Sequence, residues 1–447
     1  MPPPVMDVEA DAAFDCLGRF DHVILAVSGG PDSMALMVLA AEWCARSTSE
    51  VPTLSVATVD HGLRAESLTE ADLVRNEAAR LGLPHAILIW EGPKPRTGVP
   101  MAAREARYRL LDEHARSLPA GRIAIATAHH LDDQAETFAM RLARGAGIDG
   151  LSAMRAERSL QEGSPIALLR PLLALPKARL VATLAARGVA CADDLTNTDH
   201  RYERARLRSA LPDLDAAGLS AQALSTSARR LGDARDALVY ADERFRATLN
   251  LSYGNEVFAT LDRRAFDDGP AYLRQKVMAR LIRRYGGASP EPQLSEIEAL
   301  AARVQRDGEC AATLGGAMIS CGPRFIRVWR EAGRLDQAEI KLGRGDVRVW
   351  DRRFLLRWSA ESTGLSQTAA ASGISVKPLG AKAYAAIMPR LVQGRRPPTR
   401  AAEALPSFWA GDEFIAAPSL APFALPNSQP LDPAGFDLNP LATSFAC

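Results

Sequence analysis

The 447-residue chain has few cysteines, and they are scattered. They stand at positions 16, 44, 191, 310, 321 and 447. No two have the C-x-x-C spacing of zinc ribbons and redox dithiols, so the sequence supports neither kind of site.

Long apolar runs and an export signal are also missing. No stretch approaches the roughly 18 apolar residues that a membrane helix needs. The N-terminal segment MPPPVMDVEADAAFDCLGRF has neither a basic start nor an apolar core, so we identify no signal peptide. We expect a cytoplasmic protein that does not bind a membrane.

Neither charge sign dominates, because 54 basic residues oppose 53 acidic ones and the net charge is +1. The net charge therefore says nothing about partners. Lysine is scarce, with six residues among the 54 basic ones. This scarcity either reflects genome composition or supplies forked arginine contacts for phosphate.

Strands and helices alternate in the first half of the chain. Short apolar runs that end in polar clusters predict four strands, at residues 22–28, 54–62, 85–90 and 122–130. Amphipathic helices separate them, which is typical of right-handed βαβ units. We therefore predict an α/β fold with a parallel sheet flanked by helices.

The chain is too long for one compact core, and its pattern changes after about residue 215. We expect the α/β domain over 1–215, a mainly helical middle domain over 216–335, a small mixed α/β domain over 336–420 and a flexible, proline-rich tail over 421–447.

Shorter segments beyond residue 215 also carry predictions. The middle domain is expected to hold helices at 219–249 and 270–286 and a hairpin around Gly322 and Pro323. The third domain is expected to hold strands within 347–358 and 412–418, with a helix near 380–392.

The first predicted strand ends in SGGPDS, which comprises Ser28, Gly29, Gly30, Pro31, Asp32 and Ser33. Two glycines let backbone amides turn inward, and a helix that starts here adds the positive end of its dipole. These features predict a phosphate cradle, although an ordinary turn between strand and helix has a similar composition. No lysine directly follows a glycine, so the segment is not a Walker A loop. The absence of this lysine favours chemistry at the α-phosphate, with Asp32 holding Mg²⁺.

A second polar cluster, HHLDDQAET, follows the fourth predicted strand. Asp132, Asp133 and Glu136 share one helical face, and His129 precedes them. A negatively charged first turn that suits the helix dipole is one interpretation. The others are a carboxylate site for a cation or ammonium group, with His129 relaying a proton, and a metal-hydrolase site that lacks further histidines.

Three smaller groups remain. Asp60 and His61 end the second strand, where they contact a nucleotide or form a turn. Arg104 and Arg107 share one helical face, as do Arg204 and Arg208. Such arginines bind RNA phosphates or cover an exposed helix.

Taken together, the motifs resemble the PP-loop ATP pyrophosphatases and, among these, the tRNA(Ile)-lysidine synthases. The resemblance rests on the order of SGGPDS, DHGLR (60–64), AAREARYR (102–109), HHLDDQAET (129–137), RGAGIDGLSAM (144–154), RPLL (170–173) and DDLTNTDHRYERARLR (193–208). A weaker similarity covers 406–420. Ala205 departs from the asparagine that the family often has there, which puts one hydrogen bond in doubt.

The resemblance implies a ligase that uses ATP and Mg²⁺. The C2 carbonyl of the wobble cytidine in tRNA(Ile) with a CAU anticodon is adenylated and pyrophosphate leaves. The ε-amine of L-lysine then displaces AMP, giving lysidine. A homodimer is left open.

The same resemblance assigns roles to the candidate residues. SGGPDS would hold the phosphates, and Asp133 and Glu136 would bind the lysine ammonium. His129 or Asp132 would accept its proton, and arginines would offset phosphate charge or hold the anticodon loop; these are Arg104, Arg107 and Arg204.

Three rival functions are considered. Amidotransferase-linked synthetases would need an ammonia-generating domain, which we do not identify in this sequence. tRNA thiolases of the same superfamily use paired cysteines, which this sequence does not place together. A non-catalytic RNA-binding module would not need Asp32, Asp133 and Glu136 intact.

Overall fold

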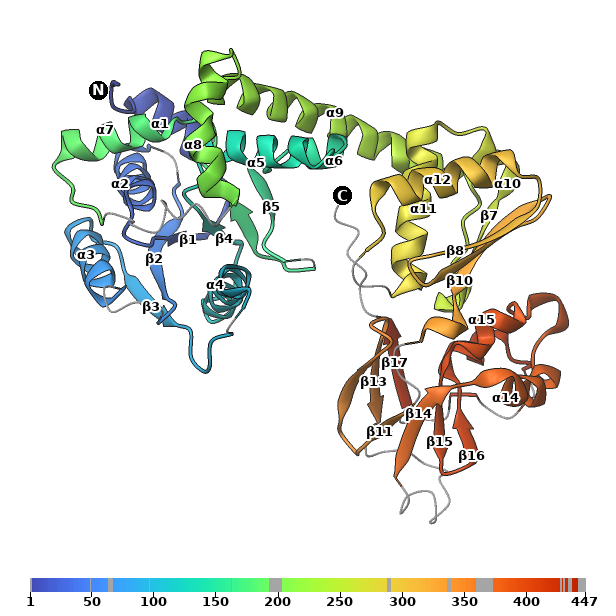
Figure 1. Ribbon diagram of the computed structural model, residues 1–447. Coiled ribbons are helices and arrows are strands. Elements are labelled where there is room, and N and C mark those ends of the chain that lie inside the picture. The colour runs from blue at the N-terminus through green and yellow to red at the C-terminus, as the bar shows by residue number, and fades with distance from the viewer. Residues whose placement is uncertain are drawn as a thin grey trace. The chain divides into compact units, whose positions relative to one another are not determined.

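The computed structural model describes residues 2–48, 50–62, 67–95, 97–161, 163–192, 203–287, 291–335, 339–358, 373–426, 428, 431–432 and 436–440. The chain divides into two compact units, residues 1–237 and 238–446 (Figure 1). The division falls inside the long helix α9 (Ala221–Thr248). The finer domain boundaries at 215, 335 and 420 stay predictions.

The first unit is built on a six-stranded sheet with the order β3-β2-β1-β4-β6-β5. Its strands are β1 (His22–Ala26), β2 (Thr53–Asp60), β3 (His85–Ile89), β4 (Ile123–Ala126), β5 (Glu157–Ser159) and β6 (Ala167–Leu169). All neighbours pair in parallel except β5 and β6. The four predicted strands and the predicted fold class are therefore confirmed, and the β5–β6 hairpin is an addition.

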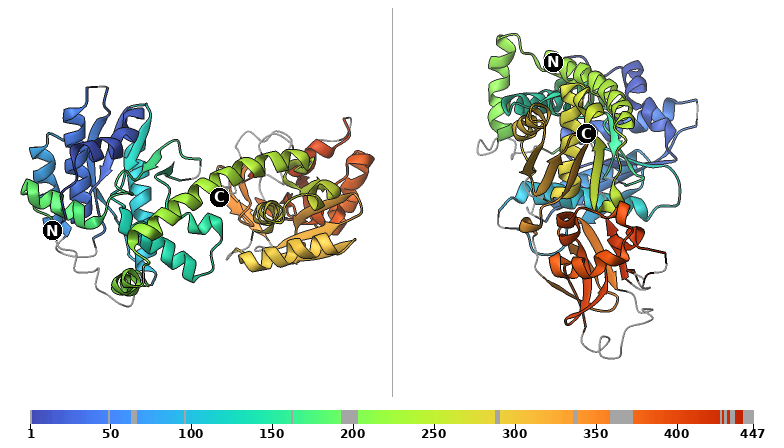
Figure 2. Two further views of the ribbon diagram at one scale, coloured as in Figure 1. Left: turned by 90° about the horizontal axis from the view of Figure 1, so that it is seen from above. Right: turned by 90° about the vertical axis from the view of Figure 1, so that its right-hand side faces the viewer.

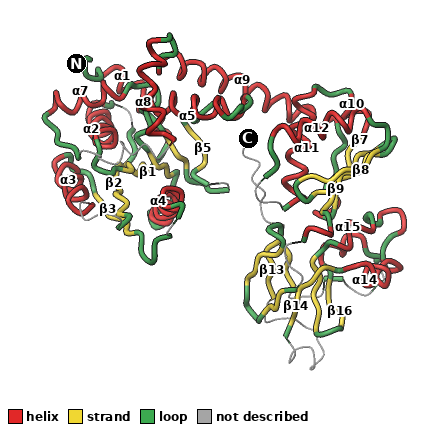
Figure 3. Tube along the Cα trace, in the orientation of Figure 1, coloured by secondary structure: helices red, strands yellow, loops and turns green. Residues whose placement is uncertain are grey.

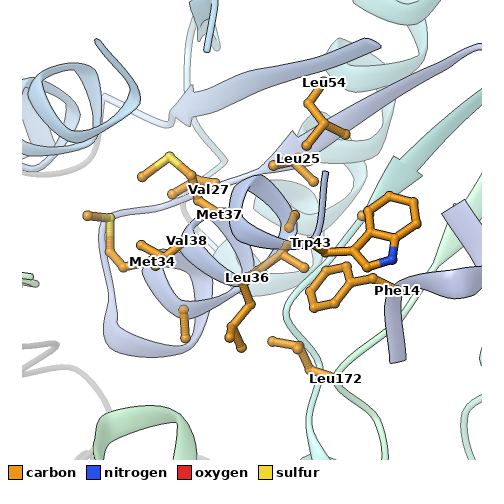
Figure 4. Close-up of a cluster of buried hydrophobic side chains, with 14 of the residues drawn as sticks. Phe14, Leu25, Val27, Met34, Leu36, Met37, Val38, Trp43, Leu54 and Leu172 are labelled. Atoms are coloured by element: carbon orange, nitrogen blue, oxygen red, sulfur yellow. The ribbon is translucent and has the colours of Figure 1, made fainter. Parts of the chain in front are cut away.

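Helices cover both faces of this sheet because its buried strands are apolar on both sides. They are α1 (Asp7–Phe14), α2 (Pro31–Arg46), α3 (Ser67–Arg80), α4 (Val99–Arg116), α5 (Leu131–Ala143), α6 (Ile148–Leu151), α7 (Lys177–Arg187) and α8 (Glu203–Ala216). Leu25 faces the cluster that α2 fills with Leu36 (Figure 4). Ile24 faces the opposite cluster, where α4 contributes Leu111. Figure 2 shows the sheet between these layers.

The strand order creates one crevice at the carboxyl edge. From β1 the chain moves outward to β2 and β3, then returns to the other side of β1 to form β4. The loops after β1 and β4 therefore leave the sheet in opposite directions. In open α/β sheets ligands bind at this reversal, so it is where a site is expected.

The second unit begins with a four-stranded antiparallel sheet, in the order β7-β10-β9-β8 (Figure 3). Its elements are β7 (Phe258–Asp262), α10 (Arg263–Asp267), α11 (Ala271–Gly286), α12 (Leu294–Arg306), β8 (Cys310–Leu314), β9 (Ala317–Cys321) and β10 (Phe325–Arg330). Helices α9 and α11 confirm the predicted helices 219–249 and 270–286. The hairpin predicted around Gly322 and Pro323 is β9–β10, and β7 and β8 extend it.

The rest of this unit holds two small sheets, ordered β11-β14-β15-β16 and β12-β13-β17. Their elements are β11 (Ile340–Leu342), β12 (Val347–Trp350), β13 (Phe354–Trp358), β14 (Ile374–Pro378), α14 (Gly380–Ile387), α15 (Thr399–Glu403), β15 (Pro406–Ala410), β16 (Glu413–Ala416) and β17 (Phe436–Pro440). The strands predicted within 347–358 and 412–418 and the helix near 380–392 are present.

The expectation of a flexible tail is wrong for residues 436–440. They form β17, which pairs antiparallel with β13. The ring of Phe436 stacks on Trp358 with centroids 6.5 Å apart and lies 5.0 Å from Phe408. The proline content of the tail hid this strand, because its partner lies about 80 residues earlier in the chain.

We expect Phe436→Ala to lower the free energy of unfolding of the second unit by about 3 kcal/mol, since it removes a buried aromatic ring from a closed cluster. Phe325 is 38% exposed in the same unit, so Phe325→Ala serves as the control and should cost under about 1 kcal/mol. Urea unfolding of both variants measures the difference. Equal losses would mean that β17 adds no packing energy.

Candidate active site at the carboxyl edge of the first sheet

A pocket of about 510 Å³ lies at the crevice between β1 and β4 in the first unit. Most of the predicted site residues line it: Ser28, Gly30, Pro31, Asp32, Ser33, Arg104, Arg107, His129, Asp133, Arg204 and Arg208. Gly29, Asp60, His61, Asp132 and Glu136 are not among the lining residues. The structure thus brings together motifs that the sequence spreads over 181 positions, from Ser28 to Arg208.

The loop after β1 closes on itself through one side chain. The Ser33 hydroxyl accepts from the Ser28 amide at 3.1 Å and donates to the Gly30 carbonyl at 2.9 Å. Helix α2 begins one residue later, at Pro31, and the first amides of a helix have no partner within it. These amides and the helix dipole would favour an anion at this loop, and the phosphate cradle stays a prediction.

The two glycines of this loop have different tasks. Gly29 has a φ of +90°, and a Cβ there would lie 3.3 Å from the Cβ of Glu70. Gly30 has an ordinary φ of −70°, and a Cβ there would meet no atom within 4 Å. Gly29 therefore permits the turn, whereas Gly30 keeps the lining of the pocket open.

We expect Gly29→Ala to lower the free energy of unfolding by about 1–2 kcal/mol through backbone strain. Gly30→Ala should change stability by less than about 0.5 kcal/mol but raise the KM for ATP, because its methyl group enters the cradle. Urea unfolding and ATP kinetics of the two variants separate the effects. A Gly29→Ala protein as stable as the parent would refute the strain.

Asp32, in the first turn of α2, is surrounded by cations. Its Oδ2 lies 3.3 Å from Lys177 Nζ and 3.5 Å from His130 Nε2. Burial works to raise the pKa of Asp32, but the hydrogen bond from His130 and the nearby Lys177 hold it below its usual value. Its other oxygen, Oδ1, is buried without a hydrogen-bond partner among the described residues. A bound cation would supply the partner that this oxygen lacks.

His130, which the sequence analysis did not single out, is the centre of this charge cluster. Its side chain is 2% exposed and lies 3.4–3.5 Å from the carboxylates of Asp32, Asp132 and Asp133. Burial alone would lower the pKa of His130, but hydrogen bonds to Asp132 and Asp32 raise it to about 9. The imidazolium thus neutralises carboxylates that would otherwise repel one another.

The two cations that the sequence analysis did not identify, His130 and Lys177, lie at the starts of helices. His130 is the N-cap of α5, and Lys177 is the first residue of α7. The doublet His129–His130 before a helix was a usable signal. Lys177 gave none, because its contact with Asp32 depends on how α7 docks.

The predicted ammonium site is filled by arginine in this structure. The side chain of Glu136 is 2% exposed, and its Oε1 accepts from Arg208 Nε at 2.5 Å. Arg208 also lies 3.5 Å from Asp133. Burial raises the pKa of Glu136 despite this pairing, and its Oε2 has no hydrogen-bond partner among the described residues. The carboxylates of Glu136 and Asp133 therefore favour a bound cation.

The opposite wall of the pocket is cationic. Arg104 lies over the ring of Tyr108, 5.1 Å from its centroid, and Arg170 is buried beside them. No described carboxylate lies within ion-pair distance of Arg104, Arg107 or Arg170. Burial, followed by the charges of Arg170 and Arg104, lowers the pKa of His129 to about 3. His129 is therefore neutral at physiological pH.

Asp60 and His61 lie at the edge of the site. The Asp60 carboxylate accepts from the Gly62 amide at 2.8 Å, which is the turn that the sequence left as an alternative. Arg107 approaches His61 Nε2 at 3.5 Å. Burial and Arg107 lower the pKa of His61 to about 4. Their contact with a nucleotide stays a prediction.

The alternatives can be compared with this geometry. Within the described residues, no group of three or more histidine, cysteine and acidic side chains is placed to hold a metal ion. No cysteine appears among the described residues that line the pocket. Cys310 and Cys321 are register partners on β8 and β9, in the other unit.

None of the helices in the described ranges is long and apolar enough to span a membrane.

Comparisons with known proteins agree with the site. A PP-loop domain model matches residues 10–214, a range that includes every described residue lining the pocket. A tRNA(Ile)-lysidine synthase from Bradyrhizobium diazoefficiens is 44% identical over 346 residues, covering 73% of this chain and 94% of that protein. One from Ruegeria pomeroyi is 37% identical over 399 residues, covering 88% and 87%. A U34-tRNA thiolase structure from Methanococcus maripaludis matches 50% of this chain and 76% of its own, at 16% identity and a TM-score of 0.40.

Proposed function

Because this chain belongs to the tRNA(Ile)-lysidine synthase family of PP-loop proteins, we propose that its pocket joins L-lysine to the wobble cytidine of tRNA(Ile) with the CAU anticodon. The observation that carries the proposal is the meeting of an anion cradle and the Asp133 carboxylate in one pocket, where Arg208 links Asp133 to the buried Glu136. Such a pocket suits a reaction between a triphosphate and an amine. A tRNA substrate places the reaction in the cytoplasm, and a homodimer stays a prediction.

The cradle from Ser28 to Ser33 would hold ATP by its outer phosphates. This places the α-phosphorus toward the pocket, where the O2 of the cytosine attacks it and pyrophosphate leaves. Asp32 Oδ1, buried and without a partner, is the oxygen that would hold Mg²⁺, since this ion commonly takes one carboxylate and the substrate phosphates. When bound, the ion would neutralise charge that develops on those phosphates.

Asp133 and Glu136 would hold the lysine ammonium. In the free protein the guanidinium of Arg208 occupies their oxygens, so lysine must displace it. Arg208 would then be free to approach the negative charge of the nucleotide. The exchange of one cation for another leaves the buried carboxylates paired throughout, which avoids a costly uncompensated charge.

A neutral amine is needed for attack on C2, so a group must take the proton from the ammonium. His129, with a pKa of about 3, is a poor acceptor for such a proton. Glu136 is better suited, because burial raises its pKa and Oε2 accepts no hydrogen bond from the described residues, although Arg204 lies 3.9 Å away. We therefore assign Glu136 as the proton acceptor in place of His129 or Asp132.

The cationic wall would hold the RNA. Arg104 and Arg107 line the pocket and have no carboxylate partner within the described part of the chain, which suits phosphate groups beside the wobble base. A module that only binds RNA would need this wall but not Asp32 or the buried His130 and Glu136.

Mass spectrometry of nucleosides from the product tRNA tests the proposal. After incubation with ATP and lysine, the wobble cytidine should gain the mass of one lysine less one water. Omission of lysine or ATP should prevent the gain. A tRNA that is bound but unchanged would favour the RNA-binding module, and a gain of sulfur would favour a thiolase.

A further inference from the structure

The hydrogen bonds around His129 determine which of its ring nitrogens carries the proton. The Thr127 hydroxyl donates to the Leu169 carbonyl at 3.3 Å, and its oxygen lies 2.9 Å from His129 Nδ1. A hydroxyl has one proton, so once it is given to the carbonyl the oxygen can only accept. The two contacts can both be hydrogen bonds only when Nδ1 carries the proton, so we assign this tautomer, which leaves a lone pair on Nε2.

That lone pair is open to the pocket. His129 lines the pocket, and Nε2 has no hydrogen-bond partner among the described residues. Nε2 is absent from the set of fully buried polar atoms without a hydrogen-bond partner, so the protein does not enclose it. Nε2 therefore presents a fixed acceptor to whatever enters, and the low pKa of His129 keeps it unprotonated.

The surroundings make this acceptor unusual. The charges that act on His129 are those of Arg170, Arg104, Arg204 and Arg107, which can only donate hydrogen bonds. A pyrimidine on this wall can offer its O2 to these donors whether it is cytosine or uracil. The two bases differ at position 4, where cytosine has an amine that donates and uracil has an oxygen that accepts.

We propose that His129 Nε2 accepts from the exocyclic amine of the wobble cytosine and so makes the site select cytosine over uracil. The proposal rests on the function proposed above and adds the residue that determines its base specificity. Uracil would place an oxygen against the lone pair, and a base without the amine would leave Nε2 unpaired. Thr127 is the positioning residue that fixes the tautomer.

The other amines in the reaction have better partners. The lysine ammonium is a cation, and the carboxylates of Asp133 and Glu136 attract it more strongly than a neutral ring surrounded by arginines does. The triphosphate is attracted to the loop after β1. Thr127, which contacts His129, is bonded to β6, and β6 lies on the other side of β4 from that loop.

A double-mutant cycle between protein and RNA tests the contact. Dissociation constants are measured for tRNA(Ile) with cytidine, or with the 2-pyrimidinone nucleoside that lacks the amine, at the wobble position. Binding is measured with α,β-methylene ATP, which cannot be cleaved to AMP, so no turnover occurs. The parent should bind the cytidine tRNA about 10- to 50-fold more tightly.

His129→Leu should bind both tRNAs with equal affinity, close to that of the parent for the 2-pyrimidinone tRNA. His129→Gln, which keeps an acceptor, should recover part of the preference, and Thr127→Val should weaken it. An unchanged preference in His129→Leu would overturn the inference, and so would an altered affinity for lysine or α,β-methylene ATP in its place. If the parent makes lysidine yet shows no coupling, only this inference fails. If it makes none, the proposed function fails.

Discussion

Asp32→Ala should abolish AMP formation, lowering the rate by about 10³-fold or more, while the affinity for tRNA stays within a few-fold. The physical reason is that Asp32 supplies the buried oxygen proposed to hold Mg²⁺ and balances His130 and Lys177. Removing it leaves two cations facing each other and takes away the group that positions the phosphates. The arginines that would bind RNA lie on the other wall, so RNA binding should persist.

The measurement is AMP release from [α-³²P]ATP in the presence of lysine and tRNA, with tRNA binding measured separately. Asp72→Ala is a matched control, because Asp72 is an exposed carboxylate on α3 that pairs with Arg75. The control should keep full activity. Normal turnover in the Asp32 variant would refute its role with the metal, and loss of tRNA binding would show that it acts through the fold.

Glu136→Gln should raise the KM for lysine by about 10- to 100-fold and change the KM for ATP far less. Glutamine keeps the shape of the side chain but cannot attract the ammonium as a carboxylate does, and a charge-assisted hydrogen bond contributes about 1.5–3 kcal/mol. The rate constant kcat should fall as well, because the proposed proton acceptor is lost.

Initial rates across lysine concentrations measure this effect. Glu113→Gln is the control, since the Glu113 side chain is 56% exposed and pairs with Arg109 on the same helix. An unchanged lysine KM in the Glu136 variant would remove Glu136 from the lysine site. The remaining candidate for holding the ammonium would then be Asp133.

The parts of the site that follow strands could be predicted from the sequence. SGGPDS and HHLDDQAET each come directly after a buried apolar run, and the carboxyl ends of parallel strands meet at one edge. Asp32 and Asp133 were therefore expected to converge, and both lie against His130. For these residues, the position of each motif after its strand was enough to predict that they meet.

Contacts that depend on packing between distant elements could not be predicted. Lys177 reaches Asp32 because α7 packs on α2, and Arg208 reaches Glu136 because α8 packs on α5. The strand at 436–440 likewise depends on β13. Each such pair is separated by about 70 residues or more, and nothing in the local pattern of either partner indicates the other.

The account depends most on the way ATP is broken. Thin-layer separation of the products of [α-³²P]ATP, with lysine and tRNA both present, tests it directly. The account predicts AMP in amounts equal to the lysidine formed, and none when either substrate is omitted. ADP as the labelled product would contradict it, because the bond at the α-phosphorus would then be intact.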